Sequence, residues 1–187
     1  MELTAEEKKI LLDAARNSIR SLFTNEKIPR PDFSKHHALK LNAGAFVTLT
    51  KSKSLRGCIG YIISDDILFN TVCNAAVQAA EFDPRFSPVT EKEVDSLSIE
   101  ISVLSPPFML NSYEEIELGK HGLILEEKGR RGLLLPQVPI EHNLNKEQYL
   151  EAICQKTNLP SDYWKTRQLK LSGFTALVFN EEELEIK

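Results

Sequence analysis

The stretch Leu55-Arg56-Gly57-Cys58-Ile59-Gly60 brings a cation, a thiol and two glycines together within six residues. Glycine has no Cβ, so the backbone beside Cys58 can adopt unusual φ and ψ angles or let another group approach closely. Arg56 supplies a permanent cation with several hydrogen-bond donors. Because a nearby cation increases the thiolate fraction of a cysteine, this stretch is a candidate nucleophile or metal-ligand site.

The flanking sequence predicts that this stretch lies on a β-hairpin. Residues 44–50 (GAFVTLT) favour a strand, residues 51–54 (KSKS) are typical of a turn, and residues 55–63 favour the returning strand. Two interpretations of Cys58 stay open. It is either a reactive thiol in an exposed, positive environment or a packing residue, since free cysteines are among the most buried residue types.

Residues 97–104 (LSIEISVL) alternate apolar and polar side chains and give the strongest strand signal in the chain. Glu100 falls on the polar face of this strand. It is either a solvated residue on the open face of an antiparallel sheet, or it faces a cleft where its carboxylate could pair with Arg56 or Arg85.

Capping signals and apolar periodicity predict helices elsewhere in the chain. Thr4 and Glu7 form a capping-box pattern, so a helix is expected from Thr4 to near Thr24-Asn25. A second helix is expected over residues 66–81, and a third is expected after an Asn145 and Gln148 pair. Further strands are predicted at residues 123–126, 133–135 and 169–179.

The composition is that of an ordinary globular protein. The 187 residues suffice for one domain or two small lobes, with 42% hydrophobic and 27% charged residues. The net charge of −4 and the pI of about 5.7 argue against broad nucleic-acid binding. Three cysteines without a paired motif, an acidic start and no long apolar run predict a cytoplasmic protein that does not span a membrane.

Candidate polar side chains come from distant parts of the chain, namely Arg56, Cys58, Arg85, Glu100, His121 and Gln137. A cysteine and a histidine from separate segments can form a nucleophile–base pair, oriented by a carboxylate or an amide. That arrangement would suit a hydrolase or an acyl transferase. No phosphate-binding loop, dinucleotide fingerprint or metal-ligand spacing is found in the sequence, so no metal is predicted.

Several motifs occur in an order that resembles the AMMECR family. They are the LRGCIG stretch at 55–60, GAFVTL at 44–49, DPRFSP at 83–88, IEISVL at 99–104, His121-Gly122, GLLLPQV at 132–138 and Trp164. Together they cover most of the chain. The chain departs from the family pattern at Asn143-Leu144-Asn145, where the family often has a tryptophan, and at Thr157-Asn158, where it often has Ala-Gly.

The resemblance implies an α+β fold, in which antiparallel β-sheets and flanking helices form one compact domain, residues 1–187, in two unequal lobes. It also implies that the signature borders a cleft between the lobes. Prokaryotic members of the family look like one component of a three-part system, beside a Memo-type protein and a radical-SAM protein. The sequence does not identify a cofactor, and the protein is expected to be a monomer or a homodimer.

Two hypotheses about function follow, and neither is preferred from the sequence. In the first, the protein is an enzyme with Cys58 as nucleophile, His121 or Glu100 as base, and Arg56, Gly57, Gly60, Arg85 and Gln137 as binding residues. In the second, the protein is a non-catalytic binding or scaffold module for partner proteins. A nucleic-acid-associated regulator is a weaker third alternative, because the protein is acidic.

Overall fold

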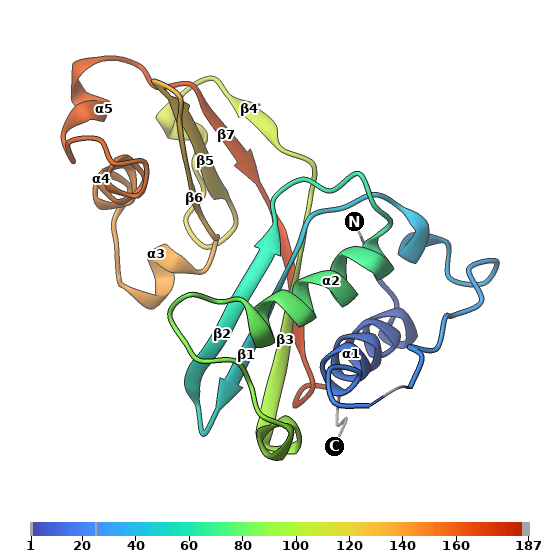
Figure 1. Ribbon diagram of the computed structural model, residues 1–187. Helices are drawn as coiled ribbons and strands as arrows, with labels where there is room; N and C mark the ends of the chain where they lie inside the picture. Colours follow the sequence, from blue (N-terminus) through green and yellow to red (C-terminus); the bar gives the residue numbers. More distant parts are fainter. Residues whose placement is uncertain (1, 25, 185–187) are drawn as a thin grey trace. The chain divides into compact units, whose positions relative to one another are not determined.

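The computed structural model describes residues 2–24 and 26–184 and shows an α+β fold with two antiparallel four-stranded sheets (Figure 1). The chain divides into two units of unequal size. The first contains residues 1–104 and 177–187, and the second contains residues 105–176. Among the described residues, no helix is long and apolar enough to cross a lipid bilayer.

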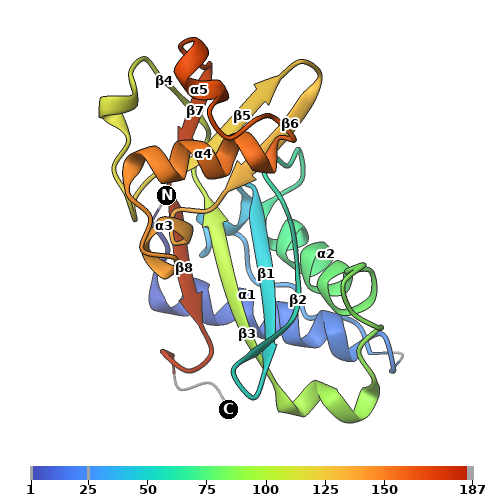
Figure 2. The ribbon, with the colours of Figure 1, turned by 90° about the vertical axis from the view of Figure 1, so that its left-hand side faces the viewer.

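The first unit packs two helices against one face of a sheet whose strand order is β2-β1-β3-β8 (Figure 2). The strands are β1 (Ala45–Lys51), β2 (Ser54–Tyr61), β3 (Leu97–Leu104) and β8 (Ala176–Asn180). The helices are α1 (Ala5–Arg20) and α2 (Leu68–Glu81), and short 3-10 turns are found at His37–Lys40 and Glu91–Ser96.

The alternation in β1 and β3 decides which face is buried. Val47, Leu49, Ile99 and Ile101 belong to the apolar core shared with α1 and α2. Residues between them, such as Thr48, therefore point to the opposite face of the sheet. The prediction of a strand over residues 97–104 is confirmed.

Both helices of this unit differ from prediction at one end. The Thr4–Glu7 capping box is present, but α1 ends at Arg20 rather than near Thr24, and Asn25 lies outside the described residues. Ser21 donates its hydroxyl proton to the Ser18 carbonyl, which competes with continuation of the helix. Helix α2 begins at Leu68 rather than at residue 66, and its N-cap residue makes no side-chain cap.

The second unit contains the sheet β4-β7-β5-β6 and three helices. Its elements are β4 (Phe108–Leu110), a 3-10 turn (Tyr113–Glu115), β5 (Gly122–Glu127), β6 (Arg130–Leu134), α3 (Val138–Glu141), α4 (Lys146–Lys156), α5 (Tyr163–Thr166) and β7 (Leu171–Phe174). The predicted capping pair of Asn145 and Gln148 starts α4. The Tyr149 side chain is fully buried, and its hydroxyl donates to backbone carbonyls, including that of His121 at 3.2 Å.

The prediction of a single final strand over residues 169–179 is wrong. The segment is divided into β7, which belongs to the second sheet, and β8, which belongs to the first sheet. The break falls at Thr175, whose backbone N–H donates to Ser105 Oγ at 2.9 Å and whose carbonyl accepts from Ser105 N at 2.9 Å. Residues 174–179 (FTALVF) are almost all apolar and contain no turn residue, so a change of partner strand leaves no local signal.

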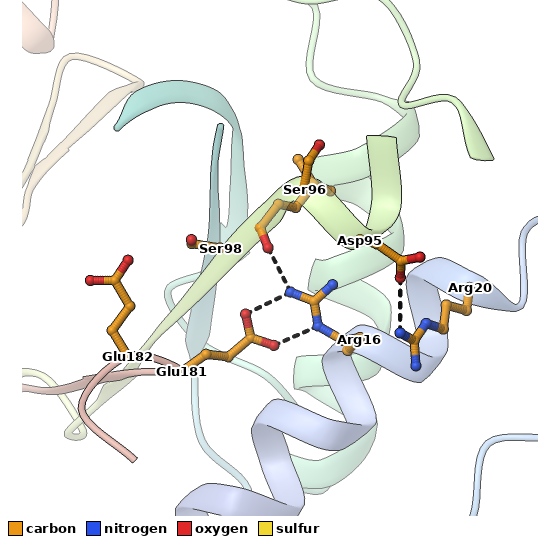
Figure 3. Close-up of a pocket in the computed structure, with 8 residues that line it drawn as sticks. Arg16, Arg20, Asp95, Ser96, Ser98, Glu181 and Glu182 are labelled. Atoms are coloured by element: carbon orange, nitrogen blue, oxygen red, sulfur yellow. Dashed lines mark hydrogen bonds and ion pairs between the residues drawn. The ribbon is translucent and has the colours of Figure 1, made fainter. Parts of the chain in front are cut away.

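The segment after β8 is fixed to the first unit by a buried ion pair (Figure 3). Arg16 of α1 donates to both carboxylate oxygens of Glu181 at 2.6 Å and to the carbonyl oxygens of Val94 and Leu97. Glu181 also accepts from the backbone N–H of Ile99 at 2.9 Å. Glu181 is therefore buried although it lies near the acidic end of the chain, and only 5% of it is exposed.

Candidate functional site

Cys58 is at one end of a row of three polar side chains on the first sheet, with Thr48 in the middle and Glu100 at the other end. In the strand register, Thr48 of β1 is opposite both Cys58 of β2 and Glu100 of β3. Directly opposed residues project to the same face of an antiparallel sheet, so all three point away from α1 and α2. The Cys58 side chain is half-buried, and Thr48 Oγ1 lies 3.3 Å from Cys58 Sγ.

Thr48 lies between Cys58 and Glu100 in this row, and Thr48 and Glu100 both line a cavity. Neighbouring strands are about 4.8 Å apart, so the Cα atoms of Cys58 and Glu100 are separated by about 10 Å. Cys58 and Glu100 therefore flank Thr48 on its two sides. A small group bound above Thr48 could contact the thiol on one side and the carboxylate on the other.

The backbone of Cys58 is held by the segment after α2. Strand β2 is at the edge of its sheet, so among the described residues no strand pairs with Cys58 on its outer side. Its N–H donates to Asp83 Oδ2 at 2.8 Å, and its carbonyl oxygen accepts from Arg85 Nη2 at 3.4 Å. Arg85 also donates to the Asp83 carboxylate at 2.7 Å. We call Asp83 and Arg85 the backbone clamp.

The charge state of the clamp follows from these contacts. The pKa of Asp83 is held well below its usual range, first by hydrogen bonds from the Arg85 side chain and then by the backbone N–H groups of Cys58 and Arg85. In turn, the hydrogen bond to the Asp83 carboxylate raises the pKa of Arg85. The Asp83 carboxylate is 4% exposed, so its negative charge is largely buried against a cation and two backbone N–H groups.

Arg56 is directed away from the thiol row by a β-bulge. Leu49 is opposite Gly57 and Thr50 is opposite Leu55, which leaves Arg56 as the extra residue. Its guanidinium donates to both carboxylate oxygens of Glu93 at 3.2 Å and to the carbonyl oxygens of Ser87 and Pro88 at 2.9 and 3.2 Å.

Lys51 also binds Glu93, at 3.1 Å. Hydrogen bonds from Arg56 first, then from Thr90 and Lys51, hold the pKa of Glu93 well below its usual range.

The two signature glycines allow close approaches on opposite faces of β2. A Cβ on Gly57 would collide with the carbonyl oxygen of Ala79, so the absence of a side chain lets α2 pack directly on the strand. A Cβ on Gly60 would collide with the backbone of Ala45 and with the ring of Phe46, the residue directly opposite it. Both glycines therefore have a packing role.

His121 and Gln137 belong to the second unit, whereas the other candidate residues belong to the first. His121 is buried, and its ring packs edge-to-face on Phe108 and accepts from the backbone N–H of Glu117 through Nδ1 at 3.3 Å. Gln137 Oε1 is buried and has no hydrogen-bond partner among the described residues.

A cavity of about 290 Å³ adjoins the row. It is lined by Thr48, Thr50, Lys53, Ser98, Ile99, Glu100, Asn180 and Glu182, all from the first unit. Within residues 2–24 and 26–184, no group of three or more histidine, cysteine, aspartate or glutamate side chains is arranged to hold a metal ion.

Thr48, Asp83 and Glu93 were not among the site residues predicted from the sequence. Asp83 opens the DPRFSP segment, and Glu93 follows this segment in the sequence. These acidic residues could have been identified from the sequence as candidate partners for Arg56 and Arg85. Thr48 could be found only from the register of the hairpin, and the bulge at Arg56 changes that register by one residue.

Comparison with known proteins agrees with these motifs. The AMMECR1 family profile matches residues 12–179. The chain is 38% identical to Protein Mbar_A1807 of Methanosarcina barkeri over 97% of this chain and 93% of that protein. It is 37% identical to a protein of Aquifex aeolicus, over 92% of each chain. The crystal structure of the uncharacterized protein PH0010 from Pyrococcus horikoshii is similar, with a TM-score of 0.88 and 36% identity over 97% of this chain and 95% of that chain. The chain belongs to the AMMECR1 family.

Proposed function

We propose that this protein is a cysteine-dependent enzyme that cleaves a small acyl compound, with Cys58 as nucleophile and Glu100 as the acid–base group. One observation carries the proposal. A half-buried thiol lies 3.3 Å from a hydroxyl and in register with a carboxylate, on a strand whose backbone is held on its outer side. Nucleophilic catalysis requires such fixed geometry.

The proposed reaction uses only these groups and water. The Glu100 carboxylate takes the proton of the Cys58 thiol as the sulfur attacks the acyl carbon above Thr48, and a carbon–sulfur bond forms. The leaving amine or alkoxide takes a proton from the Glu100 carboxyl as its bond to carbon breaks. Water then attacks the thioester and gives a proton to the Glu100 carboxylate. The carbon–sulfur bond breaks, the sulfur takes this proton back from Glu100, and the acid is released with the thiol and the carboxylate restored.

Thr48 has a supporting role in this scheme. Its hydroxyl is within hydrogen-bond reach of Sγ, and a hydroxyl that donates to sulfur stabilises negative charge on it. Glu100 is preferred to His121 as the acid–base group because the His121 ring is buried against Phe108 and its Nδ1 already accepts from Glu117. In this proposal Arg56 and Arg85 hold the backbone around Cys58 in place, because their guanidinium groups bind Glu93 and Asp83.

The reactivity of the Cys58 thiol tests the proposal. Cys73 and Cys154 are buried, so iodoacetamide should label Cys58 selectively in the folded protein, as mass spectrometry of digested protein would show. Replacement of Thr48 by valine should slow labelling about tenfold, because a hydrogen bond to a charged group is lost. Ser54→Ala, an exposed change on the same strand, should leave the rate unchanged. A Cys58 that stays unlabelled until the protein unfolds would rule the proposal out.

A scaffold function is the second candidate, and the contacts of the signature residues favour it. Arg56, Gly57, Gly60 and Arg85 all have structural roles that a non-catalytic protein would also need. The resemblance to a family that occurs beside Memo-type and radical-SAM proteins suggests those partners. A folded Cys58→Ala variant that still binds both purified proteins, from a genome that encodes all three, would favour this function over catalysis.

A further inference from the structure

The second unit carries a basic face at the end of its sheet where β5 turns into β6. This face is formed by two segments, residues 126–131 around the turn and residues 156–170 between the end of α4 and the start of β7. Together the two segments contain seven cations and three carboxylates, which give a net charge of +4. The cations are all exposed, and they are Lys128, Arg130, Arg131, Lys156, Lys165, Arg167 and Lys170.

Contacts between the two segments make this basic face one continuous surface. Arg130 donates to the carbonyl oxygen of Asn158, and Lys128 Nζ lies 4.8 Å from the centre of the Tyr163 ring. Lys170 directly precedes β7, which pairs with β5 up to the residue before the turn segment. Helices α4 and α5 lie beside β5 and β6 in Figure 1. The cations therefore gather at one end of the second sheet.

All three carboxylates are included in the net charge of the basic face, and two of them are paired. Glu126 binds Arg131 at 2.9 Å, Glu127 binds Arg167 at 3.8 Å, and Asp162 is the third. Within residues 2–24 and 26–184, no carboxylate pairs with any of the other five cations, namely Lys128, Arg130, Lys156, Lys165 and Lys170. Five positive charges therefore remain against one carboxylate, so the charges of the face do not cancel.

Three of these five cations are held by neutral groups. Arg130 binds a backbone carbonyl, Lys128 lies over the Tyr163 ring, and Lys165 Nζ lies 5.2 Å from the centre of the Trp164 ring. A carbonyl or an aromatic ring positions a cation without neutralising its charge. These side chains therefore stay available to bind an anion.

The rest of the molecule carries the opposite charge. The whole chain has a net charge of −4, so the residues outside the basic face together carry −8. A polyanion would be repelled by most of the surface and attracted to this face alone. The net charge that disfavours nucleic-acid binding over the whole protein therefore does not disfavour it here.

The make-up of the basic face favours a nucleic acid over a protein or a membrane. The core of a protein–protein interface is apolar and poor in charge, and binding to a membrane surface increases with the apolar area buried. Among the described residues, none of the exposed large hydrophobic side chains belongs to the basic face. A nucleic acid needs no such anchor, because its phosphates supply a regular row of negative charges for exposed lysine and arginine.

We propose that the basic face binds a nucleic acid through its phosphate backbone. The contacts are with phosphates rather than bases, so the binding does not depend on sequence. The inference does not rest on the proposed function, since every residue of the face belongs to the second unit and Cys58 belongs to the first.

Fluorescence anisotropy with labelled oligonucleotides of about 20 nucleotides, one single-stranded and one duplex, tests the inference. Kd should be on the order of 10⁻⁵ M at about 50 mM salt. If all five cations without a carboxylate partner bind phosphates, the slope of log K against log salt should be about −3.5 for the single strand and about −4.5 for the duplex. The probe that binds more tightly identifies the form of nucleic acid.

Two matched double variants locate the binding. Lys156→Gln with Lys170→Gln removes two cations that have no carboxylate partner, so the protein should fold, which circular dichroism would verify. This variant should weaken binding of the single strand about tenfold and make its salt slope shallower by about 1.4. Lys35→Gln with Lys40→Gln makes the same change in net charge at exposed positions of the first unit, and it should leave the slope unchanged.

Three results would overturn the inference. The first is no binding of either oligonucleotide at about 50 mM salt. The second is equal weakening by the two double variants, which would mean that net charge rather than the basic face controls binding. The third is displacement of the oligonucleotide by polyglutamate or by phosphatidylserine vesicles at equal concentration of negative charge, which would identify an acidic protein or a membrane as the partner.

Discussion

At the scale of single residues, the backbone clamp is the contact that distinguishes Cys58 from an ordinary edge-strand residue. We expect Asp83→Asn to lower the free energy of unfolding by about 2 kcal/mol, because a buried charge-assisted hydrogen bond to Cys58 N–H is weakened and Arg85 loses its partner. Urea denaturation measures the change, and amide hydrogen exchange at Cys58 should become faster.

Asp95→Asn is the matched control for the clamp. Asp95 also pairs with an arginine, Arg20, but its side chain is 84% exposed. Its loss should change stability by less than about 0.5 kcal/mol, since exposed ion pairs contribute little. Equal effects of the two substitutions would show that Asp83 has no special role.

At the scale of elements, the packing of α2 on β2 depends on the lack of a side chain at Gly57. A methyl group there would meet the carbonyl oxygen of Ala79 in the backbone of α2, which cannot move without shifting the helix. We expect Gly57→Ala to destabilise the protein by about 3 kcal/mol. Thermal unfolding followed by circular dichroism measures this, and Ser54→Ala on the same strand should have little effect. A fully stable Gly57→Ala protein would contradict the contact.

The elements also show how far the sequence predicts local structure. The capping boxes at Thr4 and Asn145 start helices as expected, because the cap residues lie within four positions of one another. The start of α2 was misplaced, because Asp66 lies one residue before the actual N-cap and accepts from Ile67 N instead. Helix ends depend on a balance of weak local bonds, so they are less predictable than helix cores.

At the scale of the whole molecule, two carboxylates paired with cations, buried Asp83 and half-buried Glu93, predict sensitivity to acid. The folded-state pKa values of Asp83 and Glu93 are lowered by Arg85 and by Arg56 with Lys51. A lowered pKa adds stability above the unfolded value of about 4, and that stability is lost as pH falls below it toward the folded value. We expect the urea midpoint to fall steeply from pH 5 to pH 3.

The double variant Asp83→Asn with Glu93→Gln tests the cause of this loss. It should be less stable than the wild type at pH 7, but its midpoint should fall less between pH 5 and pH 3, because two of the titrating groups are gone. Parallel pH curves for the two proteins would mean that other carboxylates control the acid transition.

The candidate site was partly predictable from the sequence. Cys58, Arg56, Arg85 and Glu100 were identified from residue type and motif, and all four lie in the first unit. The contacts from Arg56 to Glu93 and from Arg85 to the Cys58 carbonyl were not predicted, because each joins separate segments of the chain. The pairing of Cys58 with Thr48 needed the strand register as well as the strands themselves.

The sequence by itself determined the family, the α+β class, the hairpin and the strand at residues 97–104, because motifs, caps and alternation are local patterns. The tertiary structure alone decided which face of β2 carries the thiol. Without the bulge at Arg56, Gly57 would be opposite Thr48 and Cys58 would point toward the helices. The division of the predicted final strand at Thr175 was likewise decided by the tertiary structure alone. Both depend on which strands pair and in what register, and that is fixed by packing across the whole sheet rather than by neighbouring residues.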